Sequence, residues 1–580
     1  MTTRTEPTEP TAPPAAGTVL QGVGVGRRVA VGRVARVQPA PAVPGDAPVV
    51  RDGGVVPPDE VPDAVVAAFA AVAAGLREQS DRATGTVAEV LGATAMMADD
   101  PALRDQVLTK VRDGEPAVAA LDAAVGAFAA MFEAAGGYLA ERVTDLRSVR
   151  DRVVSRLAGL PDPGVPELRE PSVVVARDLA PADTAALDLA RVLALVTEEG
   201  GPTGHTAIIA GQNGIPCVVR ASGAAALADG AVVAVDAAHG TVTVEPDAAL
   251  RAELEARAAA ERALEQDTAP GATADGHRVR LLANIGTAED AEKLADVAVE
   301  GVGLFRTEVL FLGRQQAPAV AEQAAAYARV LRVLGPERKV VVRTLDAGAD
   351  KPLAFANLHP EENPALGVRG YRLVRSAPGL LHDQLAALAQ AGAETGTEPW
   401  VMAPMIATPA EARAFAAAVR QAGLRTAGVM VEVPAAALRA GAVLDEVDFV
   451  SLGTNDLAQY TMAADRLMGE LVDLLDAWQP AVLDLVAATA RAGAERDRPV
   501  GVCGESAGDP LMALVLTGLG VTSLSMSPAA LPAVRFALRR HTLEQCRAMA
   551  AAALAAADPA AGRAAVAALL AQDVRTTLGV

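Results

Sequence analysis

A single histidine stands between a glycine-rich turn and an apolar run in residues 198–219, which read EEGGPTGHTAIIAGQNGIPCVV. Gly200 and Gly201 permit a tight turn and Pro202 suits a helix start, so we expect His205 in the first turn of that helix. Free backbone N–H groups and the positive end of the helix dipole favour an arriving anion there and disfavour a resident imidazolium. This placement indicates a neutral imidazole that acts as a nucleophile toward phosphorus. A histidine that caps the helix or packs at a domain surface is the alternative.

A second set of polar residues follows short apolar runs in the C-terminal half of the chain. From His277 onward, eight such runs, from VRLLANIG to VTSLSMSP, alternate with helical stretches. This pattern predicts a closed (β/α)8 barrel, in which functional groups lie on the loops that follow the strands. The polar residues that follow the second, third, fifth, sixth and seventh runs are Arg306, Thr307, Glu308, Arg343, Asp346, Lys351, Glu432, Asn455, Asp456, Cys503 and Glu505.

The residue types in this set fit one kind of ligand. Its two arginines, with two more arginines from the same half of the chain, offer planar guanidinium groups for bidentate contacts with phosphate or carboxylate oxygens. Glu432 and Asp456 offer hard oxygen ligands and leave coordination positions open for water and substrate, which suits Mg²⁺. We therefore predict a pocket for a small, multiply charged phosphorylated anion. The alternatives are that the arginines form structural ion pairs and that Cys503 belongs to an apolar core. The arginines are Arg306, Arg343, Arg369 and Arg466.

Changes in residue pattern divide the chain into segments that must position these groups. Valines that alternate with glycine or arginine after Thr18 indicate short strands, whereas long alanine-rich segments with three- and four-residue apolar spacing indicate helices. Strand-like runs then return, so the helical block is expected to be inserted into an α/β unit. We expect a disordered tail at 1–17, the α/β unit at 18–57 and 161–246, the helical insertion at 58–160, a linker helix at 247–269 and the barrel at 270–580.

Composition argues against several classes of protein. The 580 residues include 51 lysines and arginines and 71 aspartates and glutamates, which gives a net charge of −20, and no basic block is long enough to follow a phosphate backbone. We therefore expect no nucleic-acid partner. No apolar stretch is long enough to span a bilayer and the N-terminus lacks a signal-peptide pattern, so we expect a cytoplasmic protein. The three cysteines form no CxxC pair, and the other histidines, all single, are expected at the surface.

Several stretches together resemble the phosphoenolpyruvate-utilising phosphotransferases, and specifically enzyme I of the bacterial sugar phosphotransferase system. They occur in that family's order and cover nearly the whole chain. The resemblance implies a swivelling α/β phosphohistidine domain, an inserted helical domain, and a dimeric barrel that binds phosphoenolpyruvate (PEP). The stretches are ERVTDLRSVRDRV in the helical insertion, GGPTGHTAIIA around the histidine, and GVGLFRTEVLF, VVVRTLDAGADKPL, EENPALGVRGYR, VMVEVPAAA, SLGTNDLAQYTMAADR and GVCGESAGDP in the barrel.

The resemblance also implies a role for each candidate residue. It makes His205 the residue that receives the phosphoryl group from PEP, with release of pyruvate, and passes it to the carrier protein HPr in the first step of sugar uptake. Cys503 would protonate the enolate, and Glu432 and Asp456 would bind Mg²⁺. The helical insertion would dock HPr, and the barrel would form a homodimer. The implied PEP contacts are Arg306, Arg343, Lys351, Arg369, Asn455 and Arg466.

The chain departs from this family pattern near the histidine and at one position of a barrel motif. Pro202 and Gly204 stand where relatives often carry arginine and serine, and Ala349 stands where a glycine is common. The missing hydroxyl and positive charge bear on the stability of the phosphohistidine and on its transfer rate. Two other functions are weighed against phosphotransfer to a protein. A dikinase or synthase would carry a large nucleotide-binding module, for which we find no segment, and a regulatory scaffold would have lost His205 or a ligand.

Overall fold

The chain divides into two units in the computed structural model. The first comprises residues 1–211 and 215–255, and the second comprises residues 212–214 and 256–580. The structure describes residues 14–37, 42–51, 53–82, 92, 94–135, 143–160, 163–165, 168–179, 187–201, 205–295, 297–311, 314–348, 353–356, 361–465 and 469–580.

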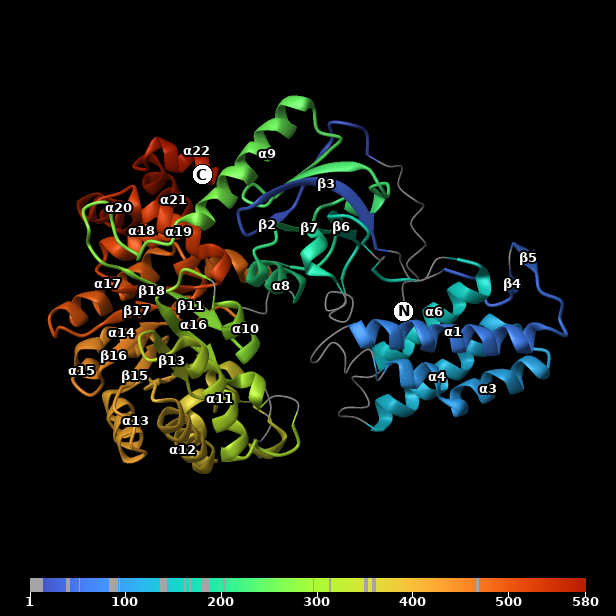
Figure 1. The fold of residues 1–580 in the computed structure, drawn as a ribbon, viewed down its shortest axis with the longest axis horizontal. Coiled ribbons are helices and arrows are strands. Elements are labelled where there is room, and N and C mark those ends of the chain that lie inside the picture. The colour runs from blue at the N-terminus through green and yellow to red at the C-terminus, as the bar shows by residue number, and fades with distance from the viewer. Residues whose placement is uncertain are drawn as a thin grey trace. The chain divides into compact units, whose positions relative to one another are not determined.

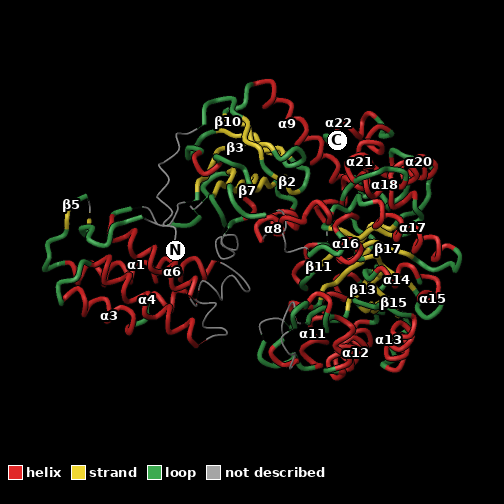
Figure 2. Tube along the Cα trace, turned by 180° about the vertical axis from the view of Figure 1, so that it is seen from behind, coloured by secondary structure: helices red, strands yellow, loops and turns green. Residues whose placement is uncertain are grey.

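A mixed sheet in the order β1-β10-β9-β3-β6-β7-β8-β2 forms part of the first unit (Figure 2). The pairs β3–β6, β6–β7 and β7–β8 are parallel, and the other pairs are antiparallel. Alternate side chains of β6 enter different apolar clusters, Val173 on one side and Val174 on the other, so both faces of the sheet are covered. The strands are β1 (Val19–Gln21), β2 (Val23–Val25), β3 (Val29–Arg36), β6 (Ser172–Ala176), β7 (Val192–Thr197), β8 (Cys217–Val219), β9 (Val232–Asp236) and β10 (Thr241–Val244).

A helical bundle forms the other described part of the first unit. α1 and α4 each contact both α3 and α6. In α1 the buried residues Val65, Phe69, Val72 and Leu76 recur at helical spacing, which places one apolar stripe against the other helices. The helices are α1 (Val61–Arg82), α3 (Pro101–Arg112), α4 (Ala117–Ala135) and α6 (Val143–Ala158), and a short hairpin of β4 (Val50–Arg51) and β5 (Gly54–Val55) contacts α6.

Two helices that the sequence pattern predicts are present, and the second is shorter than the expected 247–269. Helix α8 (His205–Asn213) begins at the histidine and buries Ala207 and Ala210 in the apolar cluster that contains Val174. Helix α9 (Ala248–Ala263) begins after Asp247, whose side chain accepts a hydrogen bond from the N–H of Leu250 at 2.8 Å. A 3-10 turn, Leu264–Gln266, follows α9.

Among the described residues, eight parallel strands close into a barrel in the second unit. Each of the eight apolar runs forms one strand, so the predicted multidomain α/β fold with a closed (β/α)8 barrel is confirmed. Figure 1 shows helices packed around these strands. The strands are β11 (Arg280–Ile285), β12 (Gly301–Arg306), β13 (Lys339–Arg343), β14 (Trp400–Ala403), β15 (Ala427–Val431), β16 (Phe449–Leu452), β17 (Val500–Val502) and β18 (Ser523–Met526).

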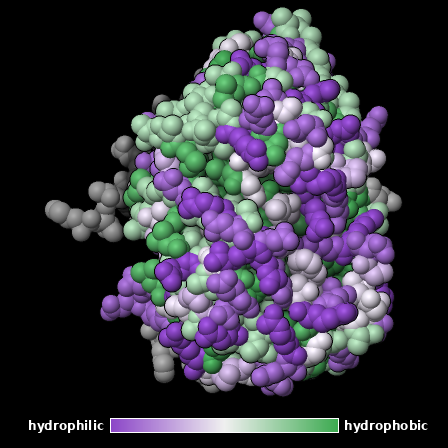
Figure 3. All heavy atoms as spheres, turned by 90° about the vertical axis from the view of Figure 1, so that its left-hand side faces the viewer, coloured by the Kyte–Doolittle hydropathy of each residue, from purple (hydrophilic) through white to green (hydrophobic). Residues whose placement is uncertain are grey.

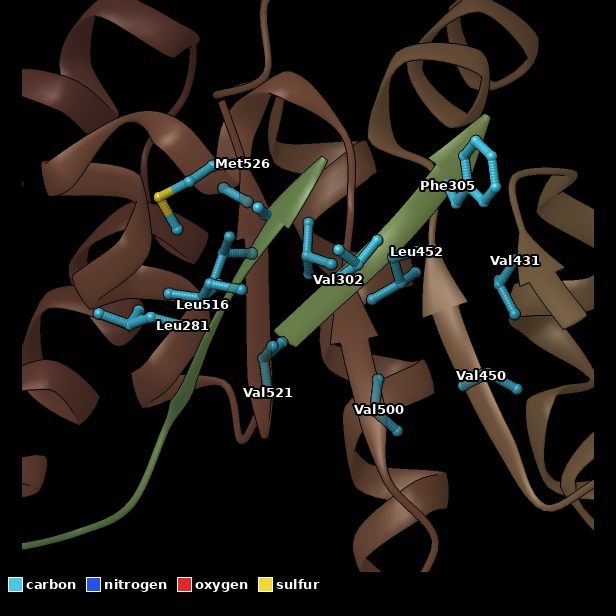
Figure 4. Close-up of a cluster of buried hydrophobic side chains, with 14 of the residues drawn as sticks. Leu281, Val302, Phe305, Val431, Val450, Leu452, Val500, Leu516, Val521 and Met526 are labelled. Atoms are coloured by element: carbon cyan, nitrogen blue, oxygen red, sulfur yellow. The ribbon is translucent and has the colours of Figure 1, made fainter. Parts of the chain in front are cut away.

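Side chains alternate between two environments along each barrel strand. On β13, Val340 and Val342 belong to the large cluster between strands and helices, whereas Val341 belongs to a smaller cluster with Phe449 and Cys503. Figure 4 shows labelled members of the large cluster between strands and surrounding helices. The helices of this unit are α10 (Ala288–Lys293), α11 (Val320–Leu334), α12 (Pro378–Thr395), α13 (Pro409–Gln421), α14 (Pro434–Leu438), α15 (Ala440–Leu444), α16 (Thr454–Met462), α17 (Pro480–Ala494), α18 (Pro510–Gly518), α19 (Leu531–Arg539), α20 (Leu543–Leu554), α21 (Pro559–Ala568) and α22 (Gln572–Leu578).

The burial of one histidine differs from the prediction that all the single histidines lie at the surface. His541 is fully buried, not at the surface, because its two ring nitrogens are within hydrogen-bond distance of the Ala537 carbonyl and the Ala571 N–H, at 2.8 and 3.0 Å. The face drawn in Figure 3 carries hydrophilic side chains over much of its area. Within the described part of the chain, no helix is both long and apolar enough to cross a membrane.

A close helix contact in the barrel unit gives a first testable prediction. A Cβ atom on Gly518, at the end of α18, would lie 2.0 Å from the carbonyl oxygen of Cys546 in α20. We predict that Gly518→Ala lowers the melting temperature of the barrel unit in calorimetry, because forcing the helices apart costs about 1–3 kcal/mol. Gly379→Ala is the control, since no atom lies within 4 Å of the corresponding position in α12. Equal melting temperatures for the two variants would contradict the packing.

Candidate active site

The carboxyl ends of the barrel strands bring most of the candidate residues to one face. β12 ends at Arg306, β13 ends at Arg343, and these two residues are paired in register. Glu432 directly follows β15, and Cys503 directly follows β17. Asp456 lies in the first turn of α16, which begins just after β16. Because all strands of a parallel barrel point the same way, these side chains share one mouth.

Buried ion pairs connect the guanidinium groups at this mouth to carboxylates. Arg343 contacts Glu308 at 2.8 Å and Asp346 at 3.0 Å. Arg369, which is 1% exposed, contacts Asp346 and Asp456, both at 3.1 Å. The structural ion pairs weighed as an alternative are therefore present at these two arginines. Asp346 bridges the two guanidinium groups and holds them at the same mouth.

The guanidinium group of Arg343 keeps one donor that the described residues do not use. The buried Nε of Arg343 has no hydrogen-bond partner among the described residues. Burial alone would lower the pKa of Arg343, but Glu308 and Asp346 raise it above its usual value. Arg306 makes no ion pair with any residue that the structure describes, and burial and then Arg343 lower its pKa. The mouth therefore holds fixed positive charge with donor capacity left over.

Glu432 is the most deeply buried carboxyl group of the set. It is 0% exposed, and its Oε1 accepts a hydrogen bond from the N–H of Met405 at 2.6 Å. Its Oε2 has no partner among the described residues and lies beside Gly453, where a Cβ would come within 2.9 Å of it. Burial, followed by the charges of Asp456 and Asp346, raises the pKa of Glu432 to about 8. The ionised form therefore needs a positive charge that the surrounding side chains do not fully supply.

The loop after β16 orients the polar groups that follow it. Asn455 Oδ1 accepts a hydrogen bond from the N–H of Glu505 at 3.1 Å, which ties the start of α16 to the loop after β17. Arg369 Nη1 donates to Asp456 Oδ1 at 3.1 Å and to the Tyr460 hydroxyl at 3.3 Å. Tyr460 lies one helical turn after Asp456, so one face of α16 holds the arginine.

The Cys503 thiol lies inside the barrel. It belongs to the apolar cluster that contains Val341, Met430 and Phe449, as the core-residue alternative requires. Its Sγ is 3.6 Å from the carbonyl oxygen of Leu452. Burial raises the pKa of Cys503 to about 11, although a hydrogen bond from Ser451 opposes that rise. The thiol thus keeps its proton at neutral pH.

Three predicted site residues fall partly or wholly outside this description. Lys351 and Arg466 lie outside the described residues. The backbone of His205 begins α8 in the first unit, as its turn-and-helix pattern predicts, but its side chain is not described. The roles assigned to these three residues stay predictions.

Sequence reasoning noted some supporting residues without giving them a role and missed others. Glu308 and Asp346 stand at strand ends, which is the signal that drew attention to the arginines, and the structure pairs them with Arg343. Tyr460 follows Asp456 by four residues and could have been found from helical spacing. Met405 had no sequence signal, because it contributes a backbone N–H from a left-handed conformation, with φ of 59°.

Comparison with known proteins divides the chain in the same order as its sequence motifs. Residues 21–142 match the N-terminal domain of PEP-utilising enzymes, residues 168–240 match their mobile domain, and residues 260–543 match their PEP-binding domain. The mobile-domain match contains His205 and the PEP-binding match contains every barrel residue of the candidate site.

Curated relatives extend this match to nearly the full chain. A phosphoenolpyruvate-protein phosphotransferase of Streptomyces coelicolor is 51% identical over 95% of this chain and 99% of the relative. A multiphosphoryl transfer protein of Xanthomonas campestris is 38% identical over 92% of this chain and 65% of the relative. A phosphoenolpyruvate-protein phosphotransferase of Haloferax volcanii is 38% identical over 90% of this chain and 94% of the relative. The chain therefore belongs to the phosphoenolpyruvate-protein phosphotransferases of the PEP-utilising enzyme family, and its activity is PEP-dependent phosphoryl transfer.

Proposed function

We propose that the chain transfers the phosphoryl group of PEP to His205 with release of pyruvate, and then to a histidine of the carrier protein HPr, as the first step of sugar uptake. PEP binds at the carboxyl ends of the barrel strands. The phosphoryl group is carried by the unit that contains α8. The cell compartment is the cytoplasm, and the barrel forms a homodimer. This proposal adds the acceptor, the partner and the pathway to the general activity of the family.

The observation that carries the proposal is that a buried hydrogen-bond donor and a buried hydrogen-bond acceptor at the barrel mouth both lack partners among the described residues. Among the described residues, Arg343 Nε is a donor without an acceptor, and Glu432 Oε2 is an acceptor without a donor. Buried polar atoms are normally satisfied, so an orphan donor and an orphan acceptor together favour a ligand with both anionic oxygens and an accompanying cation. PEP with a divalent metal ion is such a ligand.

The residues at the mouth fit Mg²⁺. Glu432 Oε2 lacks a partner, and the pKa of Glu432 is raised by burial and by neighbouring carboxylates, which a cation would offset. The described residues contain no cluster of three or more His, Cys, Asp or Glu side chains able to hold a metal. Mg²⁺ held by Glu432 and Asp456 would therefore complete its coordination with water and substrate oxygens, as this ion commonly does. When bound, it supplies positive charge to the oxygens of PEP.

The arginines bind and orient the substrate in this proposal. Arg306, Arg343 and Arg369 contact its phosphoryl and carboxylate oxygens, together with Asn455, Lys351 and Arg466. Because Glu308 and Asp346 already hold the side chain of Arg343, little side-chain motion is lost when the substrate binds. Phosphoryl transfer depends mainly on such positioning and on neutralising charge.

Proton delivery falls to Cys503. Attack of His205 on phosphorus breaks the bond between phosphorus and the enolate oxygen, and the enolate needs a proton at C3 to become pyruvate. The raised pKa of Cys503 keeps its thiol protonated at neutral pH, as a proton donor requires. His205 belongs to the first unit and the PEP-binding groups to the second, so transfer requires the two units to meet.

The helical bundle is the proposed docking region for HPr. α1, α3, α4 and α6 contribute most of its described apolar core, yet Met96 is 70% exposed and Met131 is 55% exposed. Exposed flexible apolar side chains suit a protein contact that must form and release in each cycle. The sheet with α8 serves as the phosphohistidine domain, the bundle as its insertion, and α9 as part of the linker to the barrel.

The acceptor is tested by labelling the full-length protein with PEP that carries a radioactive phosphoryl group, in the presence of Mg²⁺. We predict acid-labile label on the native chain and none on His205→Ala, because the nucleophilic nitrogen is lost. His239→Ala is the matched control, since His239 is an exposed histidine of the same unit and should keep the label. Acid-labile label on His205→Ala would overturn the assignment.

The electrostatics of Glu432 predict a pH dependence of stability in metal-free protein. The pKa of Glu432 in the folded protein, about 8, lies above the usual 4.5. The protonated carboxyl group therefore favours the folded state at low pH, and this contribution to the free energy of unfolding is lost as the pH rises through the folded-state pKa. In the presence of a metal chelator, the melting temperature of the native protein should fall as the pH is raised from about 5 to about 9. The melting temperature of Glu432→Gln should depend less on pH over the same range. Glu544→Gln, at an exposed glutamate of α20, should leave the slope unchanged. If the melting temperature of Glu432→Gln fell with pH as steeply as that of the native protein, burial of the Glu432 carboxyl group would be contradicted.

A further inference from the structure

A small cavity with serine hydroxyls in its wall lies inside the barrel, on the amino-terminal side of the candidate active site. Ser451, Gly501 and Ser523 are neighbours in register on β16, β17 and β18, and all three line it. A Cβ on Gly501 would lie 2.7 Å from Ser523 Oγ and 3.5 Å from Ser451 Oγ, so the absent side chain leaves space between two hydroxyl groups. The cavity has room for about one water molecule, which these hydroxyls could hydrogen bond.

Lys339 lines the same cavity from the amino-terminal end of the barrel. It is the first residue of β13, and the alternation of that strand places it in line with Val341 and Arg343. Lys339 is half-buried, and its ammonium group lies 4.0 Å from the centre of the Trp400 ring and 4.9 Å from that of Phe449. Burial and then the nearby positive charge of Arg280 lower the pKa of Lys339 to about 7. This side chain can therefore gain and lose a proton at neutral pH.

The upper end of the cavity reaches the thiol assigned to enolate protonation. Ser451 both lines the cavity and hydrogen bonds to Cys503 Sγ. On the next strands, Ser525 Oγ donates to Asn284 Oδ1 at 2.6 Å, and Asn284 Nδ2 donates to the Cys503 carbonyl at 3.2 Å. Hydroxyl groups thus lie at both the Lys339 level and the Cys503 level, beside apolar side chains of the barrel interior.

We propose that Lys339, the cavity water and the hydroxyls of Ser523 and Ser451 return a proton to Cys503 from the amino-terminal end of the barrel. The proposal rests on the proposed role of Cys503. In each turnover the S–H bond of Cys503 breaks and its proton forms a C–H bond at C3 of the enolate. An N–H bond of the Lys339 ammonium group then breaks and gives a proton to the cavity water, the water and the two hydroxyl groups each accept one proton and pass one on, and the thiolate regains S–H. The amine left on Lys339 takes up a proton from solvent and becomes an ammonium group again.

A proton path from the amino-terminal end of the barrel is favoured because the barrel mouth must exclude water during phosphoryl transfer. Phosphoryl transfer proceeds best where water is excluded, because water weakens the charge interactions and hydrolyses reactive intermediates. A proton is nevertheless needed in every cycle. A path through the opposite end of the barrel supplies that proton while the substrate occupies the mouth.

The test is exchange of the C3 protons of pyruvate for deuterium, followed by NMR with the full-length protein, pyruvate and Mg²⁺ in heavy water. Lys339→Arg keeps a cation over the Trp400 ring but cannot release a proton near neutral pH. We expect exchange to fall at least about tenfold, with loss of its inflection near pH 7, as removal of a proton-transfer group does. Label transfer from PEP to the protein should change less than about twofold, because no bond to phosphorus depends on Lys339.

Two further variants keep the outcome decisive. Ser523→Ala should also slow the exchange of pyruvate protons for deuterium. If Lys339→Arg does not fold, the exchange rate of Ser523→Ala tests the proton path, with the same expected fall. Lys293→Arg, at an exposed lysine of α10, is the matched control and should exchange at the native rate. Native exchange rates in both Lys339→Arg and Ser523→Ala would overturn the proton path alone. Absence of exchange in the native protein would instead overturn the role of Cys503, and the proton path with it.

Discussion

The bridge that Asp346 makes between Arg343 and Arg369 is the constraint on which the barrel mouth depends. Two buried guanidinium groups repel each other, and they can stay close only because carboxylates lie between and beside them. The same carboxylates that hold the arginines also raise the proton affinity of Glu432. The site is therefore balanced for an incoming ligand that brings negative charge to the arginines and positive charge to Glu432, as PEP with a divalent ion does.

The interior of the barrel continues this polar character toward the opposite end. Barrel interiors are usually filled by bulky branched residues. Here Gly501 and two serines at one level leave a hydroxyl-lined cavity, and Lys339 closes it from below. A charged mouth, a buried thiol and this cavity follow one another along the barrel axis because alternate residues of each strand point inward. The chemistry of proton supply can thus be separated from the chemistry of phosphoryl transfer.

Much of the architecture could be predicted from the sequence, because hydrophobic period and strand-then-helix alternation are local properties. The eight apolar runs became β11–β18, and the glycine-rich turn before His205 led into a helix that begins at that residue. His541 was assigned wrongly to the surface, since a lone histidine carries no signal for the backbone groups that surround it. Met405 could not be found for a similar reason, because its contribution is a backbone N–H presented by an unusual conformation.

The sequence by itself determined which chemical groups the protein possesses and that the barrel residues among them lie at strand ends. Spacing along the chain is enough for that, since parallel strands carry their carboxyl ends to one face. Only the tertiary structure decided which arginines are held by which carboxylates, that Glu432 Oε2 and Arg343 Nε have no partner among the described residues, and that a cavity with serine hydroxyls in its wall lies beneath Cys503. These properties depend on distances between residues from different strands, and such distances are set by the closure of the barrel rather than by local sequence.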